Sequence, residues 1–183
     1  MNPRERPVWQ RSPNIIPAGL RNTLQHSGSL TGLLEKQAPL SFNLELISQS
    51  WQKPLLDEAR LLSIGPARFA FVREIVLRFD KRPLVYGRSI IPRKTLSGAE
   101  RQLANWGQRS LGDYLFTRQG VERGVMEYAR IPAWKTYYSM DRLFSLDKDE
   151  VLWGRRSIFH VNSKPLLVIE IFLPEFSLCN MNG

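Results

Sequence analysis

Two pairs of strand-like segments dominate the chain, and in each pair only a short turn separates the partners. In the first pair, the apolar alternation of residues 67–79 leads through the turn-forming residues 80–83 into a second segment, 84–91. In the second pair, segments 156–161 and 166–173 flank another short turn. A turn this short joins antiparallel neighbours, because a parallel partner needs a long crossover. The chain is therefore predicted to form an antiparallel sheet and not a doubly wound parallel one.

Helix signals are short and lie beside these strands. Residues 31–37 have the spacing of a short helix. Ser97, followed three residues later by a glutamate, has the pattern of a capping box and predicts a helix that Gly107 ends. Ser110 begins a second N-terminal signature, for a short helix through Phe116. Helices packed on an antiparallel sheet define the α+β class.

The chain of 183 residues, with 43% hydrophobic and 23% charged residues, has the size and composition of one domain. Within this single domain, the proline-rich residues 1–27 are expected to form an irregular leader. Residues 122–130 are interpreted as helical. Residues 132–150 mix aromatic and charged side chains without a period and are interpreted as an insertion. Residues 175–183 are expected to form a C-terminal tail.

The net charge of +9 leaves three kinds of partner open: nucleic acid, an anionic membrane surface and small anionic ligands. The basic residues are spread along the chain without a nucleic-acid-binding motif, so we expect no nucleic-acid partner. No apolar run is long enough for a membrane span or a secretory signal. The single cysteine, Cys179, allows no internal disulfide. We therefore expect a cytoplasmic protein without stable membrane insertion.

Three charged residues stand where the strand patterns require apolar ones. Arg73 is in phase with the apolar residues of segment 67–79, Arg88 is in phase with those of segment 84–91, and Glu170 interrupts an apolar strand. A buried charge is costly unless it is paired or hydrogen-bonded. One interpretation is a structural ion pair between Glu170 and one of the arginines. The other is a pocket on the sheet, in which an arginine holds a carboxylate and a carboxyl group handles a proton.

Other patterns that carry chemistry are missing from the sequence. Two histidines, His26 and His160, and one cysteine cannot build a typical zinc site without carboxylates. The sequence has neither a glycine-rich phosphate loop nor a G-x-S-x-G elbow. We therefore expect no metal and no organic cofactor. The predicted helix start at Leu111 adds free backbone amides, which can bind an anion.

Several short motifs, taken in their order along the chain, resemble the chorismate–pyruvate lyase family. None of them decides the matter alone, but their joint order is specific. The first block comprises residues 73–77, 87–92, 95–98 and 111–116, and the second comprises residues 153–157 and 164–174, which include Glu170.

The resemblance implies a fold and residue roles. The family fold is a six-stranded antiparallel sheet with helices, which works as a monomer and buries its ligand under helix-turn-helix flaps. By its place in the motifs, Arg73 holds the ring carboxylate of the ligand, and Leu111 offers a backbone N–H to the same carboxylate. Glu170 lies near the ring oxygen that becomes the phenol. Arg88 follows the glycine of its motif and is expected to support the pocket and bind substrate.

The activity that the resemblance implies is a carbon–oxygen lyase reaction, which eliminates pyruvate from chorismate to give 4-hydroxybenzoate for ubiquinone biosynthesis. Chorismate carries two carboxylates, so an arginine-lined cavity suits it. The enzyme must chiefly orient the substrate and exclude water, with Arg73 and Glu170 as the catalytic candidates and Glu170 donating or sharing a proton. The alternative is a non-enzymatic sensor of an aromatic acid, because effector domains of some transcription regulators resemble this fold.

Overall fold

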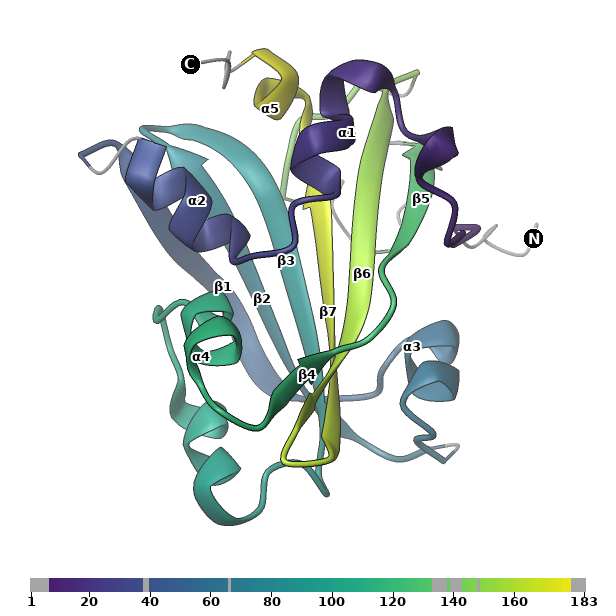
Figure 1. The fold of residues 1–183 in the computed structure, drawn as a ribbon, viewed down its shortest axis with the longest axis vertical. Coiled ribbons are helices and arrows are strands. Elements are labelled where there is room, and N and C mark those ends of the chain that lie inside the picture. Colours follow the sequence, from purple (N-terminus) through teal and green to yellow (C-terminus); the bar gives the residue numbers. More distant parts are fainter. Residues whose placement is uncertain are drawn as a thin grey trace.

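The computed structural model describes residues 7–37, 40–65, 67–132, 138, 143–147 and 149–178. In this part of the chain, seven strands form one sheet in which every pairing is antiparallel (Figure 1). Their spatial order is β1-β2-β3-β7-β6-β4, and β5 also pairs with β6. The predicted α+β class is confirmed, with seven strands in place of about six. The strands are β1 (Phe42–Gln52), β2 (Ala70–Phe79), β3 (Arg82–Pro92), β4 (Val121–Arg123), β5 (Glu127–Pro132), β6 (Val151–Val161) and β7 (Lys164–Phe172).

Both predicted hairpins are present and lie side by side at the centre of the sheet. Asp80 in the β2–β3 turn and Asn162 and Ser163 in the β6–β7 turn have positive φ, as tight hairpin turns require. β3 pairs with β7, which places Gly87 opposite Glu170. The central strands therefore bring the two sequence motif blocks together.

Short helices complete the fold. None of the described helices is long and apolar enough to cross a membrane. In Figure 1, α1, α2 and α4 lie over the face of the sheet that is turned to the viewer. The helices are η1 (Pro13–Ile15), α1 (Ala18–Leu24), α2 (Leu30–Gln37), α3 (Leu56–Leu61), η2 (Gly98–Asn105), α4 (Leu111–Thr117) and α5 (Pro174–Leu178), where η marks a 3-10 helix.

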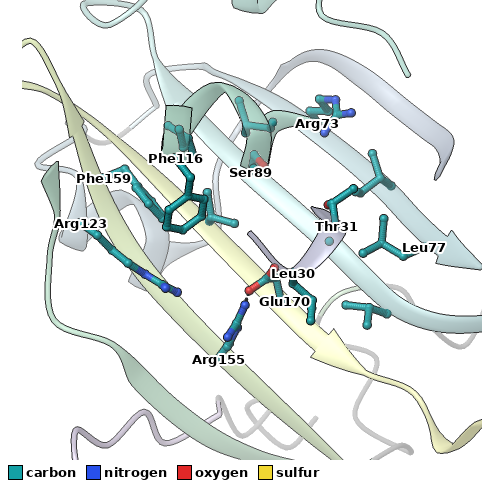
Figure 2. A pocket seen from close by; sticks show the side chains of 17 residues that line it. Leu30, Thr31, Arg73, Leu77, Ser89, Phe116, Arg123, Arg155, Phe159 and Glu170 are labelled. Carbon is teal, nitrogen blue, oxygen red and sulfur yellow. Dashed lines mark hydrogen bonds and ion pairs between the residues drawn. The ribbon is translucent and has the colours of Figure 1, made fainter. Parts of the chain in front are cut away.

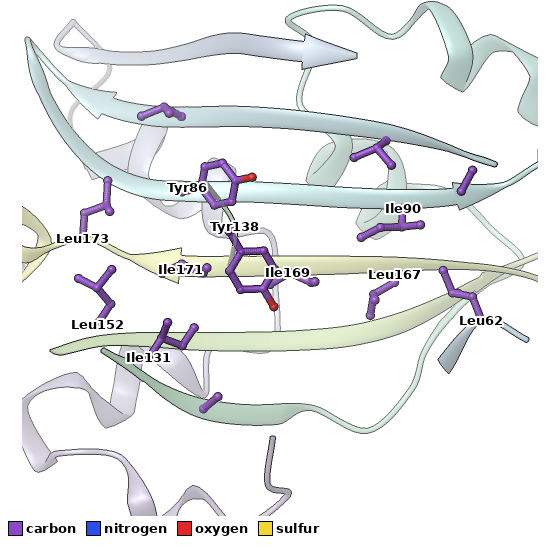
Figure 3. Packing of buried hydrophobic residues seen from close by; sticks show 14 residues of the cluster. Leu62, Tyr86, Ile90, Ile131, Tyr138, Leu152, Leu167, Ile169, Ile171 and Leu173 are labelled. Carbon is purple, nitrogen blue, oxygen red and sulfur yellow. The ribbon is translucent and has the colours of Figure 1, made fainter. Parts of the chain in front are cut away.

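The two faces of the sheet are buried in different ways. One face packs a continuous apolar core that includes Tyr86, Ile90 and Ile169 (Figure 3). The other face carries two separate clusters, one that includes Leu24 of α1 and one that includes Leu103 of η2. Because side chains alternate along a strand, each strand contributes to both faces. The cavity described below lies on the second face, between its two clusters.

The predicted helices α2 and α4 are confirmed, and Ser110 caps α4 by accepting a hydrogen bond from the Asp113 amide at 3.1 Å. The capping box at Ser97 is wrong: a 3-10 helix follows it, and its side chain makes no cap hydrogen bond. The Glu100 carboxylate accepts instead from Lys164 Nζ, at 2.8 Å. A side chain bound elsewhere cannot reach back to the helix start.

The prediction of a helix over 122–130 is also wrong, because this segment forms β4 and β5. Both strands pair with β6, with Arg123 opposite Phe159 and Tyr128 opposite Arg155. β6 is long enough to hold the two strands in succession along one edge. Pairing along this edge outweighs a weak local helix signal.

The leader contains more structure than expected. Within residues 7–27, η1 and α1 form, and Ile16 and Leu24 are buried in the core. Most of the predicted insertion 132–150 lies outside the described residues, although Tyr138 is described and packs in the core. The predicted tail begins in α5, and Cys179 lies outside the described residues.

Candidate active site

A cavity lies between the sheet and the helices α2 and α4 (Figure 2). Its empty volume, including the opening, is about 620 Å³. The walls are mostly apolar, with Leu30 from α2 and Leu111 and Leu115 from α4. Among the described residues, no group of three His, Cys, Asp or Glu side chains gathers as a metal site. The charged residues in the cavity wall are Arg73, Arg123, Arg155 and Glu170.

Arg73 enters the cavity from β2 and is only 2% exposed. Its Nε and Nη2 donate to the carbonyl oxygen of Gly107 at 3.1 and 2.9 Å, and Nη2 also donates to that of Arg109 at 2.8 Å. It forms no ion pair with a described residue. Burial lowers the pKa of Arg73 to about 10, so the guanidinium is still charged at neutral pH. A buried cation that meets only carbonyl oxygens is suited to bind an anion.

Glu170 enters from β7 and pairs with Arg155 of β6, which stands opposite it in the ladder. The distance from Arg155 Nε to Glu170 Oε2 is 2.5 Å. Arg155 is 1% exposed, and its Nη1 donates to the carbonyl oxygens of Thr23, Leu24 and His26 at 3.3, 3.2 and 2.8 Å. These carbonyls lie at the end of α1, where a cation is favourable. Arg155 thus ties the N-terminal segment to the cavity.

Arg123 enters from the edge strand β4. Its Nε donates to Ser157 Oγ at 3.1 Å, and its Nη1 donates to the Ser27 carbonyl at 3.0 Å. The guanidinium carbon lies 5.3 Å from the ring centre of Phe159 and 5.7 Å from that of Phe116, within range of a cation–π contact. Burial, followed by the positive charge of Arg155, lowers the pKa of Arg123 to about 10. Like Arg73, it forms no ion pair with a described residue.

The helices α2 and α4 meet over the cavity through Ser29. Its Oγ accepts from the Gly32 amide at 3.0 Å, which caps α2, and donates to Asp113 Oδ1 of α4 at 3.3 Å. A Cβ atom on Gly112 would lie 2.5 Å from Ser29 Oγ. The glycine therefore permits the close approach of the two helices. Leu111 begins α4, as the sequence predicted, and it lines the cavity beside Gly112.

We expect Gly112→Ala to lower the free energy of unfolding by about 1–3 kcal/mol, because the added methyl group overpacks the contact with Ser29. Amides of α2 should also exchange with solvent faster. Chemical denaturation and native-state hydrogen exchange measure the two effects. Gly19→Ala is the matched control, since no atom lies within 4 Å of its added Cβ, and it should be neutral or stabilising. Equal stabilities of the two variants would contradict the role of Gly112.

The structure does not bring Arg88, a predicted substrate-binding residue, to the cavity. Its neighbours Gly87 and Ser89 line the cavity, so strand alternation turns Arg88 to the opposite face. There it donates to both oxygens of Glu58, at 2.8 and 3.2 Å, and to Glu74 Oε1 at 2.7 Å. Burial lowers the pKa of Arg88, but the hydrogen bonds and charge of Glu58 outweigh this and raise it overall. Arg88 thus belongs to a buried ion-pair network.

Sequence reasoning missed two of the three cavity arginines. Arg155 lies just before the predicted segment 156–161, although the strand extends through it and it shares its strand phase with Ser157 and Phe159. Arg123 lies in the segment interpreted as a helix, where no strand phase applied. The alternative of a structural pair between Glu170 and Arg73 or Arg88 is wrong, because the partner of Glu170 is Arg155.

The chain thus folds as an antiparallel sheet with an arginine-lined cavity under short helices. Solved structures share the fold. The PhnF C-terminal domain matches with a TM-score of 0.58 and 16% identity, covering 78% of this chain and 88% of that one. A GntR-family transcriptional regulator from Enterococcus faecalis matches with a TM-score of 0.51 and 13% identity, covering 72% of this chain and 88% of that one. At this identity the likeness shows the fold alone.

The family follows from the sequence comparison. The model of the family described as chorismate lyase matches residues 4–179, and the chain belongs to this family. A relative from Methylococcus capsulatus is 41% identical, covering 80% of this chain and 90% of its own. A relative from Coxiella burnetii is 36% identical, covering 90% of this chain and 91% of its own. A relative from Nitrosospira multiformis is 32% identical, covering 96% of this chain and 97% of its own. All three are named probable chorismate pyruvate-lyase.

Proposed function

We propose that the protein is a chorismate pyruvate-lyase, a carbon–oxygen lyase that converts chorismate to 4-hydroxybenzoate and pyruvate. The observation that carries the proposal is the buried cavity, in which Arg73 meets no carboxylate of the described residues. An aromatic acid would supply the missing anion. Family membership across residues 4–179 favours this enzyme over the sensor alternative, whose support is a likeness of fold.

The reaction needs no co-reactant. The ring carbon that bears the hydroxyl loses its hydrogen as a proton, and the electrons of that C–H bond complete the aromatic ring. The neighbouring C–O bond breaks, and its electrons leave with the oxygen as the enolate of pyruvate. The enolate takes up one proton on its methylene carbon to become pyruvate. One proton is released and one is consumed, so the protein must orient the substrate, exclude water and handle a proton.

Four cavity residues have roles in this proposal. Arg73 binds the ring carboxylate, and the backbone N–H of Leu111 donates to the same group. Glu170 faces the other end of the ring, where its carboxylate accepts a hydrogen bond from the ring hydroxyl. The ion pair with Arg155 holds the Glu170 carboxylate in place at this end of the cavity, and a positioned carboxyl group can handle a proton. We place the enzyme in the cytoplasm, as a monomer, supplying the ring of ubiquinone.

The experiment is to mix the purified protein with chorismate and follow both products, 4-hydroxybenzoate by absorbance and pyruvate by a coupled dehydrogenase. Equal amounts of the two products are expected. If the folded protein makes neither product but binds 4-hydroxybenzoate saturably, the enzyme proposal is wrong and the sensor alternative is favoured.

Glu170→Gln should lower kcat by about 100-fold or more, since a positioned acid or base contributes this much and an amide cannot take up the proton. KM for chorismate should change much less. Steady-state kinetics separate the two constants. The matched control is Glu127→Gln, which removes a carboxylate paired with Arg156 on the same sheet, outside the cavity wall. Full turnover by Glu170→Gln would remove the proton-handling role.

A further inference from the structure

We propose that Arg123, supported by Arg155, binds the second carboxylate of chorismate, the one on the enolpyruvyl group that leaves. This inference rests on the proposed function, because it assigns the two ends of the same substrate. Arg73 then holds the carboxylate that stays on the ring, and Arg123 holds the carboxylate that departs with pyruvate.

The first argument is charge balance. Three guanidiniums and one carboxylate, Glu170, lie in the cavity wall, so two of the three positive charges have no carboxylate partner among the described residues. Buried arginines elsewhere in the described chain are neutralised. Arg88 meets Glu58 and Glu74, and Arg156 meets Asp57 and Glu127.

Among these buried arginine clusters, an excess of positive charge therefore occurs in the cavity alone. Chorismate has two carboxylates and supplies the two missing negative charges. The products divide them, since 4-hydroxybenzoate and pyruvate each carry one. A buried charge costs free energy unless it is paired, so this arrangement favours the dianionic substrate over either product alone. The positive charge of the cavity also acts on His26. Burial, and then the charges of Arg155 and Arg123, lower the pKa of its imidazole.

The second argument is position. Arg73 lies on one side of the cavity in Figure 2, while Arg123 and Arg155 lie on the other side, with Glu170 next to Arg155. In the sheet, Arg73 is on β2 and the Arg123 partner Ser157 is on β6, three strands further along. Three strand spacings amount to roughly 14 Å between backbones. Side chains that reach inward from both ends leave a slot for a small dicarboxylate.

The third argument is the way in which Arg123 is held. Hydrogen bonds to Ser157 and Ser27 fix its Nε and Nη1, and the rings of Phe116 and Phe159 lie against the guanidinium. Its Nη2 makes no hydrogen bond to a described residue. A fixed cation with a free donor is preorganised for an anion.

The same position favours the reaction. When the C–O bond breaks, negative charge moves onto the leaving enolpyruvate. A cation fixed beside that group stabilises the charge as it develops. Arg123 therefore acts on substrate binding and on bond cleavage, whereas the ring product has no group that reaches it.

The test measures kcat/KM for chorismate and the inhibition constant of 4-hydroxybenzoate in three variants: Arg123→Gln, Arg123→Lys and Arg73→Gln. For Arg123→Gln we expect kcat/KM for chorismate to fall on the order of 100-fold, with the inhibition constant of 4-hydroxybenzoate changed less than about 3-fold. Arg123→Lys should recover part of the loss because it keeps the charge. Arg73→Gln should lower kcat/KM for chorismate and the affinity for 4-hydroxybenzoate together. Arg118→Gln is the matched control, an arginine held on Tyr114 outside the cavity wall, and should behave like the wild type.

Two outcomes overturn the inference while the proposed function stands. In the first, Arg123→Gln turns over chorismate like the wild type. In the second, its kcat/KM for chorismate and its affinity for 4-hydroxybenzoate fall by the same factor. Thermal melting of each variant checks the fold. If Arg123→Gln does not fold, the comparison of Arg123→Lys with the wild type decides in the same way. A wild-type protein without turnover would instead refute the proposed function.

Discussion

Arg73→Ala is expected to lower kcat/KM for chorismate by a factor on the order of 1,000, the largest loss of activity among the cavity variants. The side chain is 2% exposed and has no carboxylate partner among the described residues, so its charge is available to the substrate. Its removal leaves the ring carboxylate buried without a cation, which destabilises the bound substrate and the transition state alike. The affinity for 4-hydroxybenzoate should fall with it, because the product keeps this carboxylate.

Arg73 also holds the loop that contains Gly107 and Arg109, so its loss could act through the loop. Gln49→Ala separates the two effects. Gln49 Oε1 accepts from the Gly107 amide at 3.2 Å, which ties down the same loop without a charge in the cavity. We expect Gln49→Ala to keep most of the activity. If both variants lose activity to the same extent, loop position, and not the anion contact, is what Arg73 supplies.

The sequence predicted one half of the cavity and missed the other, for a physical reason. Arg73 and Glu170 stand in strands whose apolar pattern is strong, so a charge within them is visible as an interruption. Arg123 stands in a strand of three residues, too short to show any period. Its place depends on pairing with β6, which is a tertiary contact and leaves no local signal.

Phase alone also cannot tell which face of a sheet holds a site. Arg73 and Arg88 interrupt apolar strands in the same way, yet one faces the cavity and the other faces the core. The distinction lies in the partners: Glu58 and Glu74 come from other elements and reach Arg88 only in the folded chain. Helix α1 is a similar case, since the proline-rich leader gave no sign that its carbonyl end would hold Arg155.

The sheet thus carries buried charge on both faces, with opposite consequences. On the core face, Arg88 and Arg156 each meet two carboxylates, and the network is complete without a ligand. On the cavity face, positive charge is in excess. Complete networks contribute to fold stability or specificity, whereas an incomplete one is a binding site. Substitutions on the two faces should therefore separate stability from activity.

Arg88→Ala is the sharpest test of this separation, and we expect it to lower the free energy of unfolding by about 3–5 kcal/mol. Glu58 is fully buried, and Glu74 also accepts from Tyr86 and Ser48, so removing the arginine leaves buried carboxylate charge without a cation. Protein that remains folded should keep KM for chorismate near the wild-type value. Urea denaturation and steady-state kinetics measure the two quantities.

The matched control is Arg78→Ala, which breaks a more exposed pair with Glu45 and should cost only about 0–1 kcal/mol. A double variant, Arg88→Met with Glu58→Met, should be more stable than Arg88→Ala, because it removes the fully buried Glu58 carboxylate together with the cation. The opposite pattern, an unchanged free energy of unfolding with a large rise in KM, would mean that Arg88 reaches the substrate. In that case it would be wrong to divide the sheet into a core face, where carboxylates of the protein pair the arginines, and a cavity face, where a ligand does so.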